Sequence, residues 1–307
     1  MRSRFVVASI LAAAIARAPS AAARAAPAAA ARPDSARIEA LTGAKGVFVA
    51  GENVFKVSVP RSDLEVRAAG MEMKPPMGLT SWASFKRSGT HTIVMGDVVV
   101  LEDQVNPVMS VALDNGLEVT ALHNHFFWDA PKVMFMHIAG MGEEPALAAA
   151  VGKVFAKIRD TSGGKGETPL ADLDPAWTTL DPSRIDAILH VKGELKDGVY
   201  KIVIGRTTRM HGEPMGSAMG VNTWAAFVGR DDRAVADGDF AVLESELQGV
   251  LKALRGAGIN VVAIHSHMTG EEPRILFLHF WGLGPTDSLA MGLRAALDRT
   301  AHAGSKP

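Results

Sequence analysis

Residues 119–126 read Val-Thr-Ala-Leu-His-Asn-His-Phe, and residues 261–268, 142 positions further along the chain, read Val-Val-Ala-Ile-His-Ser-His-Met. When the comparison is extended without a gap from Met71 to Gly142, 22 of 72 positions are identical. Unrelated segments share far fewer residues by chance, so the chain contains an internal duplication.

The duplication organises the whole chain. We predict a first repeat over residues 34–158, a polar, Gly-rich linker over residues 159–180, and a second repeat over residues 181–300. Each repeat has the length of an ordinary domain.

Residues 1–30 are expected to be a signal peptide followed by an Ala-rich spacer. Arg2 and Arg4 precede the apolar run from Phe5 to Ile15, and small residues then offer several cleavage positions up to about Ala30. The apolar run is too short to span a bilayer, and no cysteine is present to carry a lipid anchor. We therefore expect a soluble, periplasmic or secreted protein without a transmembrane segment.

The composition narrows the class of function. Of the 307 residues, 48% are hydrophobic, which argues against disorder, and 32 Lys and Arg against 33 Asp and Glu give no basic excess for nucleic-acid binding. The absence of cysteine excludes disulfides, thiolate metal sites and cysteine nucleophiles. Neither a Gly-x-Ser-x-Gly elbow, a phosphate-binding loop nor a His-Glu-x-x-His motif occurs.

Hydrophobic periodicity predicts an α+β fold. A helix is expected to begin at an N-cap Asp239, because Phe240, Leu243, Leu247, Val250 and Leu254 follow at helical spacing. The first repeat should have the same helix from Asp97, broken near Pro107. A later helix is indicated by the apolar positions Leu147, Val151, Val154 and Ile158, and by Leu289, Leu293 and Leu297.

Between those helices lie two strand-like runs, Leu117 to Phe126 and Lys132 to Ile138, which predict an antiparallel hairpin. Each repeat is thus expected to be an antiparallel sheet with a hairpin and two packed helices.

The hairpin carries most of the histidines in the chain. Side chains alternate along a strand, so the two members of each His-x-His share one face, and the predicted register places His137 opposite His123. Three imidazoles on one face are a suitable ligand set for Zn²⁺, Fe²⁺ or Cu²⁺. The two predicted triplets are His123, His125 and His137 in the first repeat, and His265, His267 and His279 in the second.

Asp129 and Glu271 each follow the second histidine by four residues, on the expected turn. There a carboxylate could complete the metal shell or act as a catalytic base. Two alternatives remain open: a polar cluster that binds or acts without metal, and histidines with a structural role only. Whether the triplets form two sites or one shared site is also open.

Methionines near the triplets are a further observation. Met71, Met73 and Met77 in the first repeat, and His211, Met215 and Met219 in the second, lie in loop-like sequence. Thioether ligands beside histidine favour copper, whereas methionine also fills gaps in ordinary cores.

The string Ala-Leu-His-Asn-His, together with Met136-His137-Ile138-Ala139-Gly140, resembles the signature of the LppY/LpqO family of exported bacterial proteins, whose domain has no known function. The resemblance covers both repeats and implies export. Gly116, His123, His125 and Asp129 also follow the order of a cupin motif, which implies a metal-dependent oxygenase, isomerase or binding protein.

The sequence thus predicts an exported protein that binds a transition metal through its duplicated histidine triplets, with a metal ion or small molecule as partner. The alternatives are a metal-dependent hydrolase or oxygenase and a metal-free binding module of the cell envelope.

Overall fold

The structure, a computed structural model, describes residues 31–163 and 169–301. The predicted signal peptide lies outside the described residues. Chain order in the first half is α1 (Ser35–Thr42), β1 (Gly46–Val49), β2 (Val54–Pro60), β3 (Arg67–Ala68), β4 (Met71–Glu72), η1 (Pro75–Met77), β5 (Thr80–Ser88), β6 (His91–Leu101), α2 (Glu102–Asp114), β7 (Glu118–His123), β8 (Asp129–Ala130), β9 (Val133–Gly142) and α3 (Glu144–Asp160).

The second half repeats this order with one strand fewer. After the short helix η2 (Pro175–Trp177) come α4 (Pro182–Leu189), β10 (Glu194–Lys196), β11 (Val199–Gly205), β12 (Thr208–Met210), β13 (Glu213–Met215), η3 (Ser217–Met219), β14 (Asn222–Arg230), β15 (Arg233–Leu243), α5 (Leu247–Gly256), β16 (Asn260–His265), β17 (Ile275–Gly284) and α6 (Thr286–Leu297).

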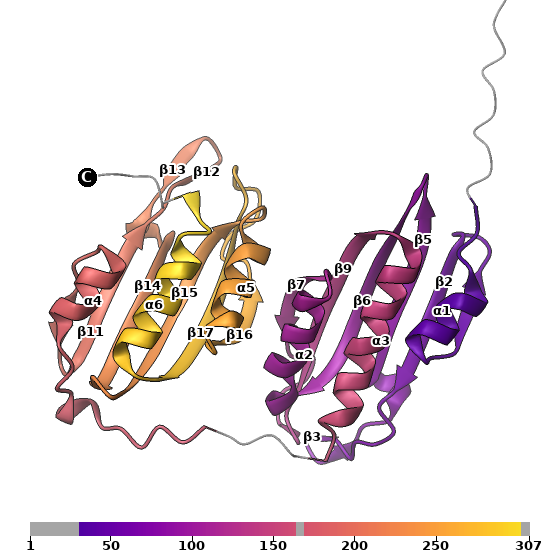
Figure 1. Ribbon diagram of the computed structural model, residues 1–307, viewed down its shortest axis with the longest axis horizontal. Coiled ribbons are helices and arrows are strands. Elements are labelled where there is room, and N and C mark those ends of the chain that lie inside the picture. Colours follow the sequence, from indigo (N-terminus) through magenta and orange to yellow (C-terminus); the bar gives the residue numbers. More distant parts are fainter. Residues whose placement is uncertain (1–30, 164–168, 302–307) are drawn as a thin grey trace, which may run out of the picture.

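Twelve strands from both halves form one antiparallel sheet, in the order β1-β2-β5-β6-β9-β7-β16-β17-β15-β14-β11-β10. The halves meet where β7 and β16 pair antiparallel through Leu122 and Ile264. A pseudo-two-fold axis therefore passes between these strands, and the two halves lie side by side across it (Figure 1). The predicted class of helices with an antiparallel sheet is confirmed.

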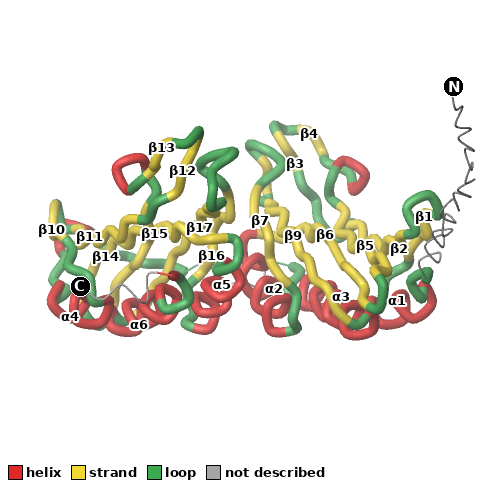
Figure 2. The backbone as a smooth tube through the Cα atoms, turned by 90° about the horizontal axis from the view of Figure 1, so that it is seen from above, coloured by secondary structure: helices red, strands yellow, loops and turns green. Residues whose placement is uncertain are grey.

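The α-helices cover one face of this sheet, and two small flaps stand on the other, which we call the open face (Figure 2). The first flap consists of β3, β4 and β8, and the second of β12 and β13. In β6, Val98 and Val100 belong to the main core under the helices, whereas Val99 and Leu101 belong to a smaller core under the first flap. The central strands are therefore buried on both faces.

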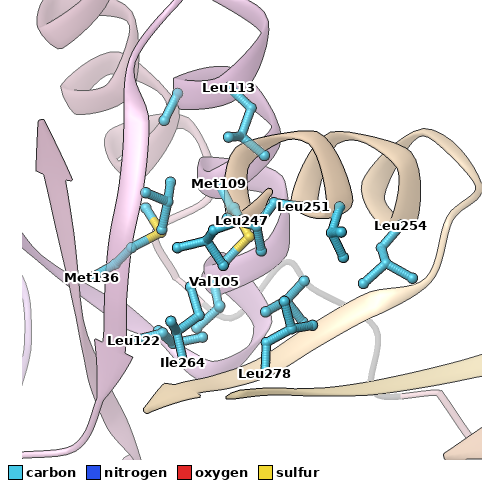
Figure 3. Close-up of a cluster of buried hydrophobic side chains, with 14 of the residues drawn as sticks. Val105, Met109, Leu113, Leu122, Met136, Leu247, Leu251, Leu254, Ile264 and Leu278 are labelled. Atoms are coloured by element: carbon cyan, nitrogen blue, oxygen red, sulfur yellow. The ribbon is translucent and has the colours of Figure 1, made fainter. Parts of the chain in front are cut away.

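The interface between the halves is itself a hydrophobic core. Helices α2 and α5 approach each other above the β7–β16 pair, where Met109 and Leu251 lie among buried leucines (Figure 3). Two side-chain amides complete the interface by replacing strand hydrogen bonds. Gln248 bonds both backbone groups of Val119, at 3.0 and 2.9 Å, and Asn106 does the same for Val261, at 2.8 and 3.2 Å.

The predicted start of the first helix in each repeat is wrong. Asp97 and Asp239 lie within strands β6 and β15, and the helices begin only at Glu102 and Leu247. The residues after Asp97 are a run of buried valines, which suits a central strand covered on both sides. Pro107 lies inside α2 and does not end it.

The predicted hairpin exists, but its register differs by two residues. His123 lies opposite Phe135, and His137 lies opposite Ala121. A shift of two residues preserves the face on which each side chain points, so His123 and His137 still share one face. Strand β7 ends at His123, so His125 lies in the loop that follows and not on the strand as predicted. Among the described residues, no helix is both long and apolar enough to cross a membrane.

Candidate metal centres

The histidine triplets lie on the open face, beside an aspartate from the next strand. Asp97 in β6 is paired with His137 in β9, and Asp239 in β15 is paired with His279 in β17. Directly opposed residues on one face bring their side chains together. Each centre is therefore built from three neighbouring strands and the loop that follows the hairpin's first strand.

In the first repeat, His123 and His137 face each other, with their Nε2 atoms 3.0 Å apart. The Oδ2 atom of Asp97 lies 3.9 Å from Nε2 of His137. The His125 ring is 5.1 Å from that of His123 and stacks on Phe135, with ring centroids 3.3 Å apart. Phe135 thus supports the loop histidine from below.

In the second repeat, the loop histidine completes the closest pair. The Nε2 atoms of His265 and His267 are 3.0 Å apart, and Oδ2 of Asp239 lies 3.7 Å from Nε2 of His267. One ligand atom from each of these three residues lies within 4.8 Å of the other two. The ring of His279 stacks on that of His265, with centroids 4.8 Å apart.

Several polar atoms at the centres are buried without a hydrogen-bond partner. They are Oδ1 of Asp97, Oδ1 of Asp239 and Nδ1 of His265. Burial raises the pKa of Asp239 to about 6, so its charged form is poorly compensated. Leaving such atoms unpaired is costly in a folded protein, and a bound cation would remove that cost for the carboxylates.

Three of the histidines have a lowered pKa, which favours the neutral form that binds metals. Burial lowers the pKa of His125, His265 and His267. Nδ1 of His279 lies 3.3 Å from the carbonyl oxygen of Gly238, and Nδ1 of His123 lies 3.3 Å from that of Asn124. A backbone carbonyl at Nδ1 fixes the ring and turns Nε2 toward the centre, where Nε2 of His123 shares a hydrogen bond with Nε2 of His137.

The spacing of the nitrogens fits one ion per repeat. Two imidazole nitrogens bound at about 2.0–2.1 Å to one zinc ion lie roughly 2.9–3.4 Å apart. The closest pair in each repeat is separated by 3.0 Å. Together with the partnerless carboxylate oxygens, this donor set suits a divalent transition metal.

Asp129 and Glu271 lie in the hairpin turns, where their carboxylates accept backbone hydrogen bonds. Asp129 accepts from the amide of Val133 at 2.9 Å and pairs with Lys132, and Glu271 accepts from the amide of Ile275 at 3.2 Å. Neither belongs to the close group of Asp239, His265 and His267. Their predicted role as base or fourth ligand stays a prediction.

The sequence reasoning missed Asp97 and Asp239 as site residues and placed them at helix starts. One sequence feature could have indicated a role at the site, because Gly96-Asp97 and Gly238-Asp239 are identical between the repeats. The glycines are explained by packing: a Cβ on Gly238 would lie 2.2 Å from the Trp224 carbonyl oxygen.

The methionines near the centres divide into two groups. Met73 is buried in the small core under the first flap, and Met215 packs against the corresponding core in the second repeat. Met77 and Met219 are exposed. Each precedes a glycine that lies next to the loop histidine of its repeat. Gly78 lies beside His125, and the backbone of Gly220 forms a hydrogen bond with His267. Copper ligation by methionine stays a prediction.

Residues 36–157 and 183–299 each match a family described as Domain of Unknown Function (DUF1259). The chain belongs to this family, in two tandem copies. No curated protein is similar enough to count as a match.

Among solved structures, the chain is similar to a trimeric bacterial microcompartment shell protein, PduB, at 12% identity. The similarity covers 85% of this chain and 94% of that chain with a TM-score of 0.19, which is too low to carry any argument.

Proposed function

We propose that this protein binds transition-metal ions at two equivalent centres on the open face of its sheet. The ligands of the first centre are His123, His125 and His137 with Asp97. Those of the second are His265, His267 and His279 with Asp239. The two centres are separate sites, because each is built from the strands of its own repeat.

One observation carries the proposal. Asp239, His265 and His267 bring their ligand atoms within 4.8 Å of one another, while Oδ1 of Asp239 and Nδ1 of His265 have no hydrogen-bond partner. In most folded proteins, buried polar atoms such as these have protein donors or acceptors as partners. Imidazole with one carboxylate suits zinc, iron or copper.

The test is elemental analysis of protein purified without an affinity tag, followed by titration of the metal-free protein with Zn²⁺, Fe²⁺ and Cu²⁺. We expect about two equivalents of one metal per chain. The double variant His265→Ala/His267→Ala should lower this to about one, and His123→Ala/His125→Ala should do the same. His91→Ala is the matched control, because His91 is exposed and outside both centres.

Parent protein that takes up no metal under these conditions would overturn the proposal. So would variants of either triplet that bind the parent's full complement while remaining folded. Circular dichroism of each variant separates loss of ligands from loss of fold.

A second candidate is a metal-dependent hydrolase or oxygenase, and the exposure of the imidazoles favours it. The side chains of His137 and His279 are 36% and 41% exposed, so water or substrate can reach a bound ion. A bound metal would supply Lewis acidity and a water of lowered pKa. Asp129 or Glu271 would be the base, and hydrolysis of a chromogenic phosphodiester or ester by metal-loaded but not chelated protein tests this.

Export is part of the proposal and rests on the N-terminal sequence. Arg2, Arg4 and the apolar run that follows are typical of a cleavable signal peptide. The resemblance of the Ala-Leu-His-Asn-His string to the LppY/LpqO family supports the same location. N-terminal sequencing of protein from the periplasm or medium tests both.

A further inference from the structure

The first flap ends in a group of exposed apolar side chains, which we call the flap tip: Met71, Phe127 and Trp128. Phe127 is 72% exposed, Trp128 is 81% exposed and Met71 is 54% exposed. The flap stands above the open face, away from the helices (Figure 2). Large aromatic side chains this exposed contribute nothing to the core and commonly mark an interaction surface.

The backbone at Trp128 gives a second, independent indication. Trp128 has a φ of 57°, in the left-handed region that bulky residues rarely adopt. The second repeat has Gly270 at this position, with a φ of 82°. Glycine adopts this conformation without steric cost, whereas tryptophan does not. A strained residue that makes no buried contact indicates a function outside the folded chain.

The second repeat also shows that the flap does not need an apolar tip. Its residues at the equivalent positions are Glu213, Thr269 and Gly270. The charges differ as well: segments 67–74 and 127–132 hold three cations and two carboxylates, whereas segments 209–216 and 269–274 hold two cations and three carboxylates. The segments of the first flap therefore carry a net charge of +1 and those of the second a net charge of −1. In the first flap Lys74 pairs with Glu72 and Lys132 pairs with Asp129, so the net positive charge corresponds to Arg67.

Two hydrogen bonds satisfy backbone carbonyls at the flap tip. The amide of Ala69 donates to the carbonyl of Trp128 at 3.2 Å, and the guanidinium of Arg67 donates to the carbonyl of Gly70. The carbonyls of Trp128 and Gly70 would therefore not enter the bilayer interface unpaired.

We propose that the flap tip is a membrane-docking element that inserts Phe127 and Trp128 into the interface of an anionic phospholipid bilayer. Tryptophan prefers this interface, and the net positive charge of the first flap, in contrast to the net negative charge of the second, favours acidic headgroups. A protein partner fits less well, since a stable protein interface buries about 800 Å² per side. Two aromatic side chains of about 150–250 Å² each and one methionine on a projecting tip cover less.

The test is flotation of the full chain with unilamellar vesicles of phosphatidylcholine and phosphatidylglycerol in a ratio of about three to one. The deciding variant is Phe127→Thr/Trp128→Gly, which copies the second repeat. We expect it to lower the vesicle-bound fraction at least tenfold while raising the melting temperature, because glycine relieves the strain at position 128. Trp177→Ser, which removes a tryptophan 77% exposed elsewhere, is the matched control and should bind as the parent does.

The proposal is overturned if the parent does not float with these vesicles, or if the Phe127→Thr/Trp128→Gly variant floats equally well. It is also overturned if Trp177→Ser lowers binding as much. Flotation is measured with and without a chelator. Binding that persists in chelator supports docking whether or not the histidine centres hold metal, so the two proposals fail separately.

Discussion

Asp239 lies directly opposite His279 on neighbouring strands, and the carboxylate is almost fully buried with one oxygen lacking a hydrogen-bond partner. The same relationship holds between Asp97 and His137 in the first repeat. Each repeat thus keeps a carboxylate in a position that is unfavourable without a cation. If these centres bind metal as proposed, they trade stability of the metal-free protein for affinity.

The uncompensated carboxylate of Asp239 predicts how the variant Asp239→Asn changes the stability of the metal-free protein. Because burial raises the pKa of Asp239 to about 6, its ionised form weakens the fold above that pH, and the penalty disappears as the pH falls below the ordinary value of 3.8. Without metal at pH 8, we expect the variant to be more stable by roughly 1–2 kcal/mol after allowance for solvent screening. Urea denaturation with and without metal measures this.

The same variant should lose most of the stabilisation that metal gives the parent. Asp298→Asn is the control, because Asp298 is an exposed carboxylate of the same half and should change neither quantity. A less stable metal-free Asp239→Asn variant would contradict the idea that this carboxylate is uncompensated.

The ion pair between Arg206 and Glu246 predicts that the stability of the second repeat depends on pH. Burial alone would raise the pKa of Glu246, but hydrogen bonds from Arg206 and from the amides of Leu243 and Ala301 outweigh it and lower the pKa below 4.5. Because its pKa is lowered in the folded protein, the Glu246 carboxylate stabilises the fold at pH values above its unfolded-state pKa. This stabilisation is lost as the pH falls through the folded-state pKa. The equivalent residue in the first repeat is Gln104, which suggests the variant Glu246→Gln.

We expect Glu246→Gln to cost about 1–2 kcal/mol at pH 7 and much less at pH 3, because a neutral amide replaces a charge-assisted partner. Denaturant titrations at both pH values give the comparison. The exposed Glu244, two residues away, provides the control Glu244→Gln, which should be neutral at both. An equal loss at both pH values would mean that charge is not the source of the stabilisation.

The hydrogen bonds that Gln248 makes across the interface predict how strongly the stability of one half depends on the other. Replacing it with leucine leaves both backbone groups of Val119 without a partner at the interface, which should cost about 1–3 kcal/mol. Asn106→Leu should have a similar effect on Val261, and the double variant should unfold in two separated steps by calorimetry. Lys252→Leu, on the exposed side of the same helix, is the control. One sharp transition in the double variant would argue against this role.

The close packing around Gly238 predicts that a larger residue does not fit at this position, which lies next to the second centre. A Cβ at this position would lie 2.2 Å from the Trp224 carbonyl oxygen and 2.5 Å from the ring of Phe280. We expect Gly238→Ala to cost about 2–3 kcal/mol and to weaken metal binding, since Asp239 follows it on the strand. Gly256→Ala, with no atom within 4 Å, should be neutral. Thermal melts and metal titrations of both variants check the contrast.

Patterns among residues close together in the sequence were sufficient to predict part of this structure. The alternation of side chains across the hairpin placed His123 and His137 on one face, and the helical spacing of Leu147, Val151 and Val154 located α3. The same reasoning failed at Asp239, because Phe240, Leu243 and Leu247 fit a helical stripe as well as a strand followed by a helix. A strand buried on both faces has no alternation that would distinguish it.

The sequence by itself determined the duplication, the helix around Val151 and the hairpin that brings His123 and His137 to one face, because helices and hairpins depend on residues close together in the chain. Tertiary structure alone decided that β7 and β16 join the halves into one sheet, with both centres on its open face. It also decided that Asp97 and Asp239 lie beside the histidines. The pairing of strands distant in sequence depends on how whole faces pack, and no local pattern encodes that choice.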